Sequence, residues 1–113
     1  MAWFRRKRRD GMSASEARDV EREAAEHFVE WMSTRHGIEI FTEPRTTMQV
    51  PTMMLVASDG EFTRRPVRSP EEAEKFAREH ALPIYDATVV GYPQRMRDYS
   101  RRQTVQKRRD ARG

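Results

Sequence analysis

Cysteine is absent from this chain of 113 residues. Its absence excludes a disulfide framework, a thiolate zinc site and a cysteine nucleophile, and it fits a reducing compartment. Long apolar runs are absent as well, because the longest, 53–57, is far below the roughly 20 residues that a membrane-spanning helix needs. The apolar residues 1–4 precede the charges at 5–9, which is the reverse of a secretory signal. We therefore expect a cytoplasmic protein without a membrane span.

Glycine is scarce, and its five occurrences are isolated from one another. A glycine-rich phosphate loop is thus excluded, and the sequence has no serine elbow and no metalloprotease signature. His27 lies near carboxylates at helical spacing, with Glu23 before it and Glu30 after it. Two carboxylates and one histidine are a weak metal site, so a solvated helix face is the favoured interpretation. We predict no catalytic residue, no metal and no cofactor.

Charge is plentiful but unevenly distributed along the chain. Charged residues make up 35% of the sequence, and the net charge is +4. Residues 1–10 carry a net charge of +4 and residues 91–113 carry +6, whereas residues 11–90 carry −6. The length fits one domain, and a hydrophobic fraction of 36% indicates that the ends lie outside the core. The predicted parts are a basic N-terminal arm at 1–12, a core domain at 13–92 and a basic C-terminal arm at 93–113.

Two segments carry the signals of amphipathic helices. Ser13 followed by Glu16 has the spacing of a capping box, and Gly37 is the expected end of the first helix. Apolar residues recur at three- and four-residue spacing between these signals. Ser69 followed by Pro70, with a glutamate at capping-box spacing, opens the second helix. Both helices are expected to pack one face on a sheet.

Four extended segments alternate with turn signals. They are residues 38–43, 50–57, 61–68 and 84–90. Asp59-Gly60 is typical of a two-residue hairpin turn in which both φ angles are positive. Pro66 cannot donate a ladder hydrogen bond, so its strand is expected at an edge. The order α-β-β-β-α-β predicts an α+β fold with a small sheet of about four strands, two helices on one face and basic, partly disordered termini.

The arginine-rich ends are the strongest functional signal in the chain. Arginine and lysine release counterions from a polyanion and bind phosphate whatever the sequence, although such a segment also serves as a merely solubilising tail. Aromatic rings among the charges can stack on unpaired bases. The residues predicted to bind nucleic acid are Arg5, Arg6, Lys7, Arg8, Arg9, Tyr92, Arg95, Arg97, Tyr99, Arg101, Arg102, Lys107, Arg108 and Arg109. A secondary basic group comprises Arg45, Arg64, Arg65 and Arg68, whose simpler role is protection of a sheet edge.

Three short motifs resemble a group of small actinobacterial proteins. They are Glu43-Pro44-Arg45-Thr46-Thr47, Asp59-Gly60-Glu61 and Val90-Gly91-Tyr92-Pro93-Gln94-Arg95-Met96-Arg97-Asp98-Tyr99. Some members of that group are labelled oxidoreductases, but this chain has no nucleotide, flavin or metal motif that supports the label. The resemblance implies a source, and its last motif places a functional surface after the final strand.

Double-stranded-RNA-binding domains share the order of one helix, three strands and one helix. They require a basic cluster at the start of the second helix, where this chain has Glu71, Glu72 and Glu74, so that assignment is rejected. We predict a non-enzymatic accessory protein that binds RNA or a ribonucleoprotein such as the ribosome through its arginine-rich arms. The alternative is a protein-interaction module that acts on a transcription complex or another assembly through the acidic first helix. No small-molecule substrate is indicated.

Overall fold

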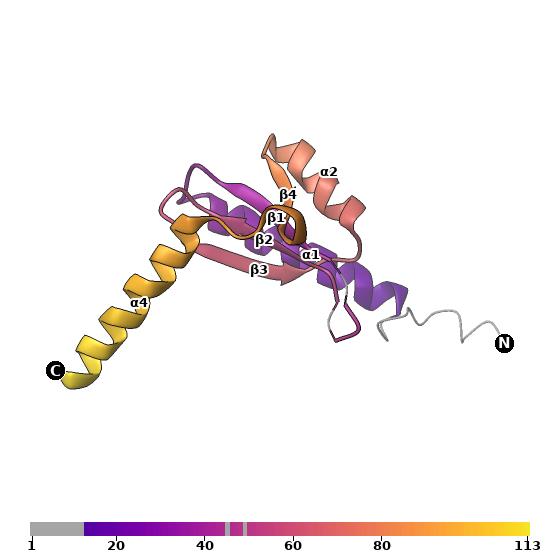
Figure 1. The fold of residues 1–113 in the computed structure, drawn as a ribbon. Helices are drawn as coiled ribbons and strands as arrows, with labels where there is room; N and C mark the ends of the chain where they lie inside the picture. The colour runs from indigo at the N-terminus through magenta and orange to yellow at the C-terminus, as the bar shows by residue number, and fades with distance from the viewer. Residues whose placement is uncertain (1–12, 45, 49) are drawn as a thin grey trace.

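The computed structural model describes residues 13–44, 46–48 and 50–113. Its strands form one sheet in the order β3-β2-β1-β4, in which β1 pairs antiparallel with β2 and parallel with β4, and β2 pairs antiparallel with β3. The predicted α+β class and the four-stranded sheet are confirmed (Figure 1). The elements in chain order are α1 (Ala14–Met32), β1 (Glu39–Glu43), β2 (Thr52–Val56), β3 (Phe62–Pro66), α2 (Pro70–His80), β4 (Ile84–Asp86), α3 (Ala87–Val90) and α4 (Gln94–Arg112).

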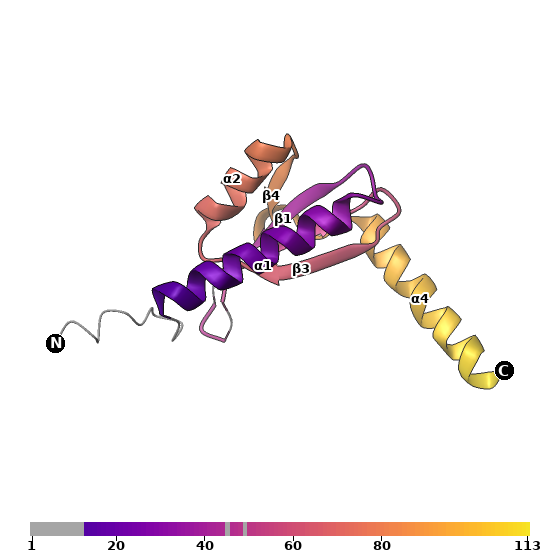
Figure 2. The same ribbon diagram turned by 180° about the vertical axis from the view of Figure 1, so that it is seen from behind.

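One face of the sheet is covered by α1 and α2. Phe28 of α1 and Phe76 of α2 meet edge to face, with ring centroids 5.6 Å apart. Both rings belong to a buried core that includes Ile40 of β1 and Leu55 of β2. Helix α1 lies behind the sheet in Figure 1 and in front of it in Figure 2. The prediction of two helices on one face is confirmed.

The opposite face of the sheet is covered by α3 and the beginning of α4. Phe41 of β1 and Met54 of β2 form a second buried cluster with Ala87 of α3, and Met96 of α4 packs against it. The prediction that a strand continues to residue 90 is wrong, because the carboxylate of Asp86 accepts a hydrogen bond from the backbone N–H of Thr88 at 2.8 Å and starts a helical turn. The cap brings a helix to this face where the sequence pattern indicated more strand.

Both predicted helix starts are present, but two details differ. At α1, Ser13 and Glu16 form the complete capping box, and the helix ends at Met32 before Gly37 is reached. Gly37 instead has a positive φ of 65° in the loop before β1. At α2, the Ser69 hydroxyl accepts from the Glu72 N–H at 3.3 Å, whereas the Glu72 carboxylate accepts from the residue before the cap. The sequence signals therefore located the starts better than the ends.

The hairpin between β2 and β3 has a longer loop than the sequence motif predicted. The N–H of Ala57 donates to the carbonyl of Glu61 at 2.8 Å, and the N–H of Gly60 donates back to Ala57 at 3.0 Å. Only Gly60 in this loop has a positive φ, at 94°, so the two-residue turn is wrong. A longer loop that ends in a left-handed glycine is another common hairpin connection. The edge position of β3, which contains Pro66, is confirmed.

The C-terminal segment forms a long helix, α4, where composition had favoured a partly disordered arm. Arginine, glutamine and lysine are good helix formers, and side chains four residues apart add bonds of 2.9 Å from Gln94 to Asp98 and from Gln106 to Asp110. No residue of α4 is buried, and the helix projects from the sheet (Figure 1). Within the described part of the chain, no helix is both long and apolar enough to cross a membrane.

Replacing Gly60 by valine should destabilise the protein by at least about 1 to 3 kcal/mol, the cost of a strained backbone. A side chain is disfavoured at φ 94°, and a Cβ there would lie 1.9 Å from the carbonyl oxygen of Arg95. Urea unfolding measures the change. The exposed Ser58 of the same loop provides the control, because Ser58→Ala should shift stability by less than about 0.5 kcal/mol. Equal unfolding midpoints for Gly60→Val and the native protein would contradict the assigned loop.

Candidate nucleic-acid interface

The base of α4 is held against the sheet by the side chain of Arg95. Its Nε donates to the carbonyl oxygen of Ala57 at 3.0 Å, and its terminal nitrogen forms an ion pair with the carboxylate of Glu39. Gly60 lies against the backbone of the same residue, where no side chain would fit. The Arg95 side chain is only 31% exposed. These contacts favour a role for Arg95 in positioning the helix over direct contact with a ligand.

A second anchor forms around Glu43, the last residue of β1. Its carboxylate accepts two hydrogen bonds from Arg64 of β3, at 3.0 and 3.1 Å, and one from Thr52 of β2 at 2.6 Å. The hydroxyl of Tyr92, which precedes α4, donates to the same carboxylate. The Glu43 carboxylate, whose side chain is 13% exposed, therefore links β1, β2 and β3 to the segment that leads into α4.

The electrostatics of this anchor follow from its hydrogen bonds. Burial alone would raise the pKa of Glu43, but the bonds from Arg64, Thr52 and Tyr92 outweigh burial, so the pKa lies below its ordinary value of 4.5. The bond to Glu43, together with burial, raises the pKa of Tyr92. The carboxylate is therefore charged and the phenol protonated over the whole neutral range.

The first half of α4 packs against the loop between β2 and β3. Tyr99 lies against this loop, because a Cβ on Gly60 would come within 3.0 Å of the Tyr99 Cβ. Arg102 donates to the carbonyl oxygen of Asp59 at 3.1 Å, with its guanidinium 5.8 Å from the centre of the Tyr99 ring. Tyr92 and Tyr99, predicted to stack on bases, thus contact the protein itself. Their contacts favour a positioning role.

The secondary basic group is also engaged by the fold. Arg64 pairs with Glu43, and Arg68 pairs with Glu21 of α1 at 3.0 Å. Arg65 donates to the carbonyl oxygen of Arg64 at 2.8 Å. These bonds favour the edge-protecting role over a phosphate-binding one. Arg45, and the N-terminal candidates Arg5, Arg6, Lys7, Arg8 and Arg9, lie outside the described residues.

His27 contacts the sheet through both of its ring nitrogens. Its Nε2 lies 2.7 Å from the hydroxyl of Thr63, and its Nδ1 lies 3.2 Å from the guanidinium of Arg65. Burial, reinforced by the charge of Arg65, lowers the pKa of His27. A cation beside the ring opposes the binding of a metal there, and the described residues contain no cluster of metal-ligating side chains.

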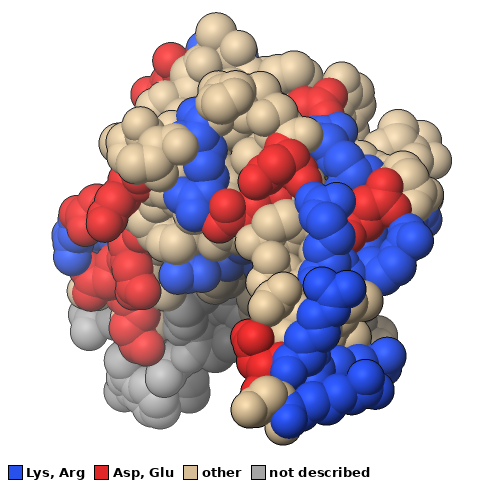
Figure 3. All heavy atoms as spheres, turned by 90° about the vertical axis from the view of Figure 1, so that its left-hand side faces the viewer, with Lys and Arg blue, Asp and Glu red and all other residues tan. Residues whose placement is uncertain are grey.

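The remaining cations of α4 point into solvent. The helix carries eight basic and two acidic residues. Arg101 pairs with Asp98 at 2.5 Å, with both side chains exposed. Figure 3 shows the basic side chains gathered along the projecting helix. Arg95, Arg101 and Arg102 of α4 form ion pairs or side-chain hydrogen bonds, and among the described residues the α4 cations that form none are Arg97, Lys107, Arg108, Arg109 and Arg112.

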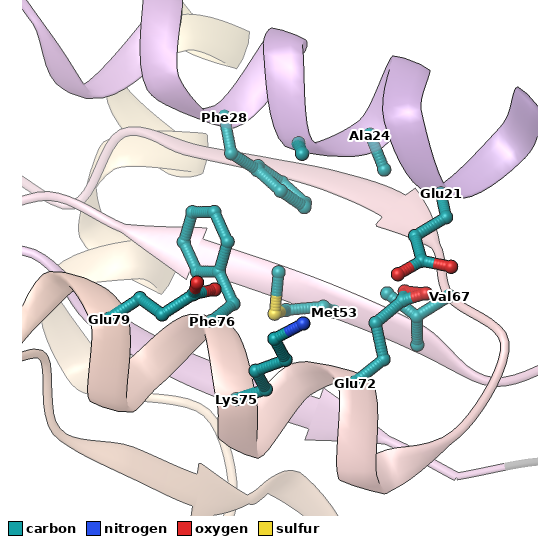
Figure 4. A pocket seen from close by; sticks show the side chains of 10 residues that line it. Glu21, Ala24, Phe28, Met53, Val67, Glu72, Lys75, Phe76 and Glu79 are labelled. Atoms are coloured by element: carbon teal, nitrogen blue, oxygen red, sulfur yellow. The ribbon is translucent and has the colours of Figure 1, made fainter. Parts of the chain in front are cut away.

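A small cleft lies between α1 and α2. Its open volume is about 80 Å³, against the roughly 300 Å³ or more of a typical ligand pocket. Phe28 and Phe76 line one end, and the carboxylates of Glu21 and Glu72 approach each other at the other end (Figure 4). Burial raises the pKa of Glu72. The cleft is a packing gap with an acidic rim.

The chain matches no known family model, and no curated protein and no solved structure is significantly similar to it. The resemblance to small actinobacterial proteins therefore stays a hypothesis. The assignment of the site rests on the geometry and charge of α4.

Sequence reasoning identified the arginines of α4 but missed the residues that hold the helix. Glu39 and Glu43 read as ordinary strand carboxylates, and Gly60 read as a turn residue only. A signal was present in two of the motifs, which contain Glu43 and Gly60. Nothing in their spacing indicates that Glu43 meets the segment leading into α4 or that Gly60 meets α4 itself.

Two neighbouring arginines should respond differently to substitution. Arg95→Gln removes the Glu39 ion pair and the bond to Ala57, so it should lower stability by about 1 to 2 kcal/mol. Arg97→Gln removes a solvated side chain and should change stability by less than about 0.5 kcal/mol. Urea unfolding of both variants checks the difference. Equal effects would show that the Arg95 contacts do not hold the helix.

Stability should depend on pH through Glu43. Because its folded pKa is lower than its unfolded value, its stabilising contribution is complete above about pH 4.5 and is lost as the pH falls through the folded pKa. Glu43→Gln should therefore be less stable than the native protein at neutral pH, with the gap narrowing in acid. Urea midpoints measured between about pH 7 and pH 3 give both curves. Parallel curves would contradict the charged anchor.

Proposed function

We propose that this protein binds RNA or a ribonucleoprotein, such as the ribosome, through the positive charge of α4, without catalysis. The observation that supports the proposal is the helix itself, which projects from the domain and carries cations that no carboxylate of the described chain neutralises. Folded proteins usually pair or disperse such charge. A projecting cationic helix has the form of a contact surface for a polyanion.

Phosphate is the partner that this chemistry favours. Each arginine presents a planar fork of donors that matches phosphate oxygens, and each phosphate contact releases condensed counterions. The affinity of such binding therefore falls steeply as the salt concentration rises. Five unpaired cations on one helix are enough for several simultaneous contacts, which gives sequence-independent affinity.

The acidic charge of α1 and α2 favours the approach of a polyanion from the side of α4. Helices α1 and α2, which cover one face of the sheet, carry ten acidic and four basic residues. A polyanion is repelled from that face and attracted to α4, so the field of the protein orients the encounter before contact. The same acidic surface is what the alternative, a protein-interaction module, would use for binding a basic partner.

Deleting residues 103–113 should separate folding from binding. These residues are all exposed, so the melting temperature should stay nearly unchanged. The deletion removes Lys107, Arg108, Arg109 and Arg112, so the dependence of log affinity on log salt should become shallower by up to about 3, at about 0.7 per phosphate on a single strand. Fluorescence anisotropy with labelled RNA across a salt series measures this slope.

The matched control removes positive charge from the other side of the protein. Arg18 and Arg22 are exposed on α1, and changing both to glutamine should leave RNA affinity unchanged or slightly higher. If the native protein binds neither RNA nor ribosomes at about 0.1 M salt, where screening still permits arginine–phosphate attraction, the proposal is wrong and the protein-interaction alternative replaces it.

A further inference from the structure

Four arginines of α4 fall on one line along the helix. Arg97, Arg101, Arg108 and Arg112 follow one another at spacings of four, seven and four residues. At 3.6 residues per turn these spacings place all four within a sector of about 60°. We call these four residues the outer stripe. Arg95 and Tyr99, which contact the sheet and the loop between β2 and β3, lie on the opposite side of the helix.

The outer stripe is built as two pairs with a neutral gap. Arg97 and Arg101 form one pair and Arg108 and Arg112 the other, with pair centres separated by about 16 Å at 1.5 Å per residue. Arg101 also forms an ion pair with Asp98 at 2.5 Å, and both side chains are exposed, so this is a weak surface pair that a phosphate can replace. The stripe positions between the pairs are uncharged, and Val105, at the centre, is 39% exposed. The acidic residue of the distal half, Asp110, lies toward the body side, where its carboxylate accepts from Gln106 at 2.9 Å.

This geometry discriminates between kinds of RNA. Proteins that bind single strands combine cations with aromatic rings on which bases stack. The stripe has no aromatic residue, and Tyr92 and Tyr99 are held by contacts with the body. A flexible strand also loses conformational freedom when it follows a rigid line of charge. A duplex already holds two rows of phosphates at a fixed separation, and proteins recognise double-stranded RNA by its shape and phosphates.

We propose that the outer stripe binds the double-stranded part of a structured RNA, with one arginine pair on each phosphate row beside a groove. This inference rests on the proposed function and names its ligand class. The anchors at Arg95 and Glu43 then act as positioning contacts, because they hold the stripe away from the acidic layer of α1 and α2. The chemistry recognised is two phosphate rows at fixed spacing, which a DNA duplex also supplies, so the experiment includes both.

The test compares two double variants of α4 that each remove two positive charges, one from the outer stripe and one from positions beside it. Arg108→Gln with Arg112→Gln removes one pair of the stripe, whereas Lys107→Gln with Arg109→Gln removes two cations that lie about 100° to either side of it. All four positions are exposed, and glutamine keeps the helix propensity of arginine and lysine. The probes are an RNA duplex of about 16 base pairs, one of its strands alone, and a DNA duplex of the same sequence.

The native protein should bind the RNA duplex more tightly than the single strand. The Arg108 and Arg112 variant should lose about two phosphates' worth of salt slope on the duplex, and the Lys107 and Arg109 variant less than one.

Equal losses in both variants, with native binding intact, would overturn the stripe and leave the proposed function standing. Single-strand binding as tight as duplex binding would overturn the ligand class. Equal binding of the DNA duplex, with the difference between the two variants kept, would leave the stripe standing and overturn RNA as the source of its phosphates. Failure to bind any probe would overturn the proposed function as well.

Discussion

The direction of α4 depends on the contact between the loop that joins β2 to β3 and the backbone of Arg95. Gly60 permits the contact because it has no side chain and adopts a positive φ, and Arg95 then reaches the sheet to pair with Glu39. The two contacts depend on each other, because the Arg95 side chain reaches Glu39 only where the Arg95 backbone lies close to Gly60. With this contact, the basic helix keeps a defined direction relative to the acidic helices.

Charge in this protein is divided between residues that build the fold and residues that remain for a partner. Arg64 and Arg68 neutralise Glu43 and Glu21, and the two hydrogen bonds from Arg64 to Glu43 make the first of these pairs part of the framework. The cations of distal α4 have no such partners in the described chain. Counting basic residues along the sequence overstates the charge available for binding, because the number that remains depends on which cations the fold uses.

Several local structures followed from local sequence signals. The capping box at Ser13 and the Ser69-Pro70 start depend on residues within one helical turn, and the edge position of β3 follows from the missing donor of Pro66. The end of α1 and the form of the hairpin loop were wrong because several conformations satisfy the same local pattern. Close packing of Gly37 and Gly60 against neighbouring segments selects among them.

By itself, the sequence determined that α4 would be basic, that the helices over the sheet would be acidic, and that the core would be α+β, because composition and hydrophobic periodicity are properties of the chain. Only the tertiary structure decided which arginines are available. Arg95 and Arg97 are two positions apart and look alike in sequence, but two steps along a helix rotate a side chain by about 200°. One therefore faces the sheet and holds the helix, and the other faces water.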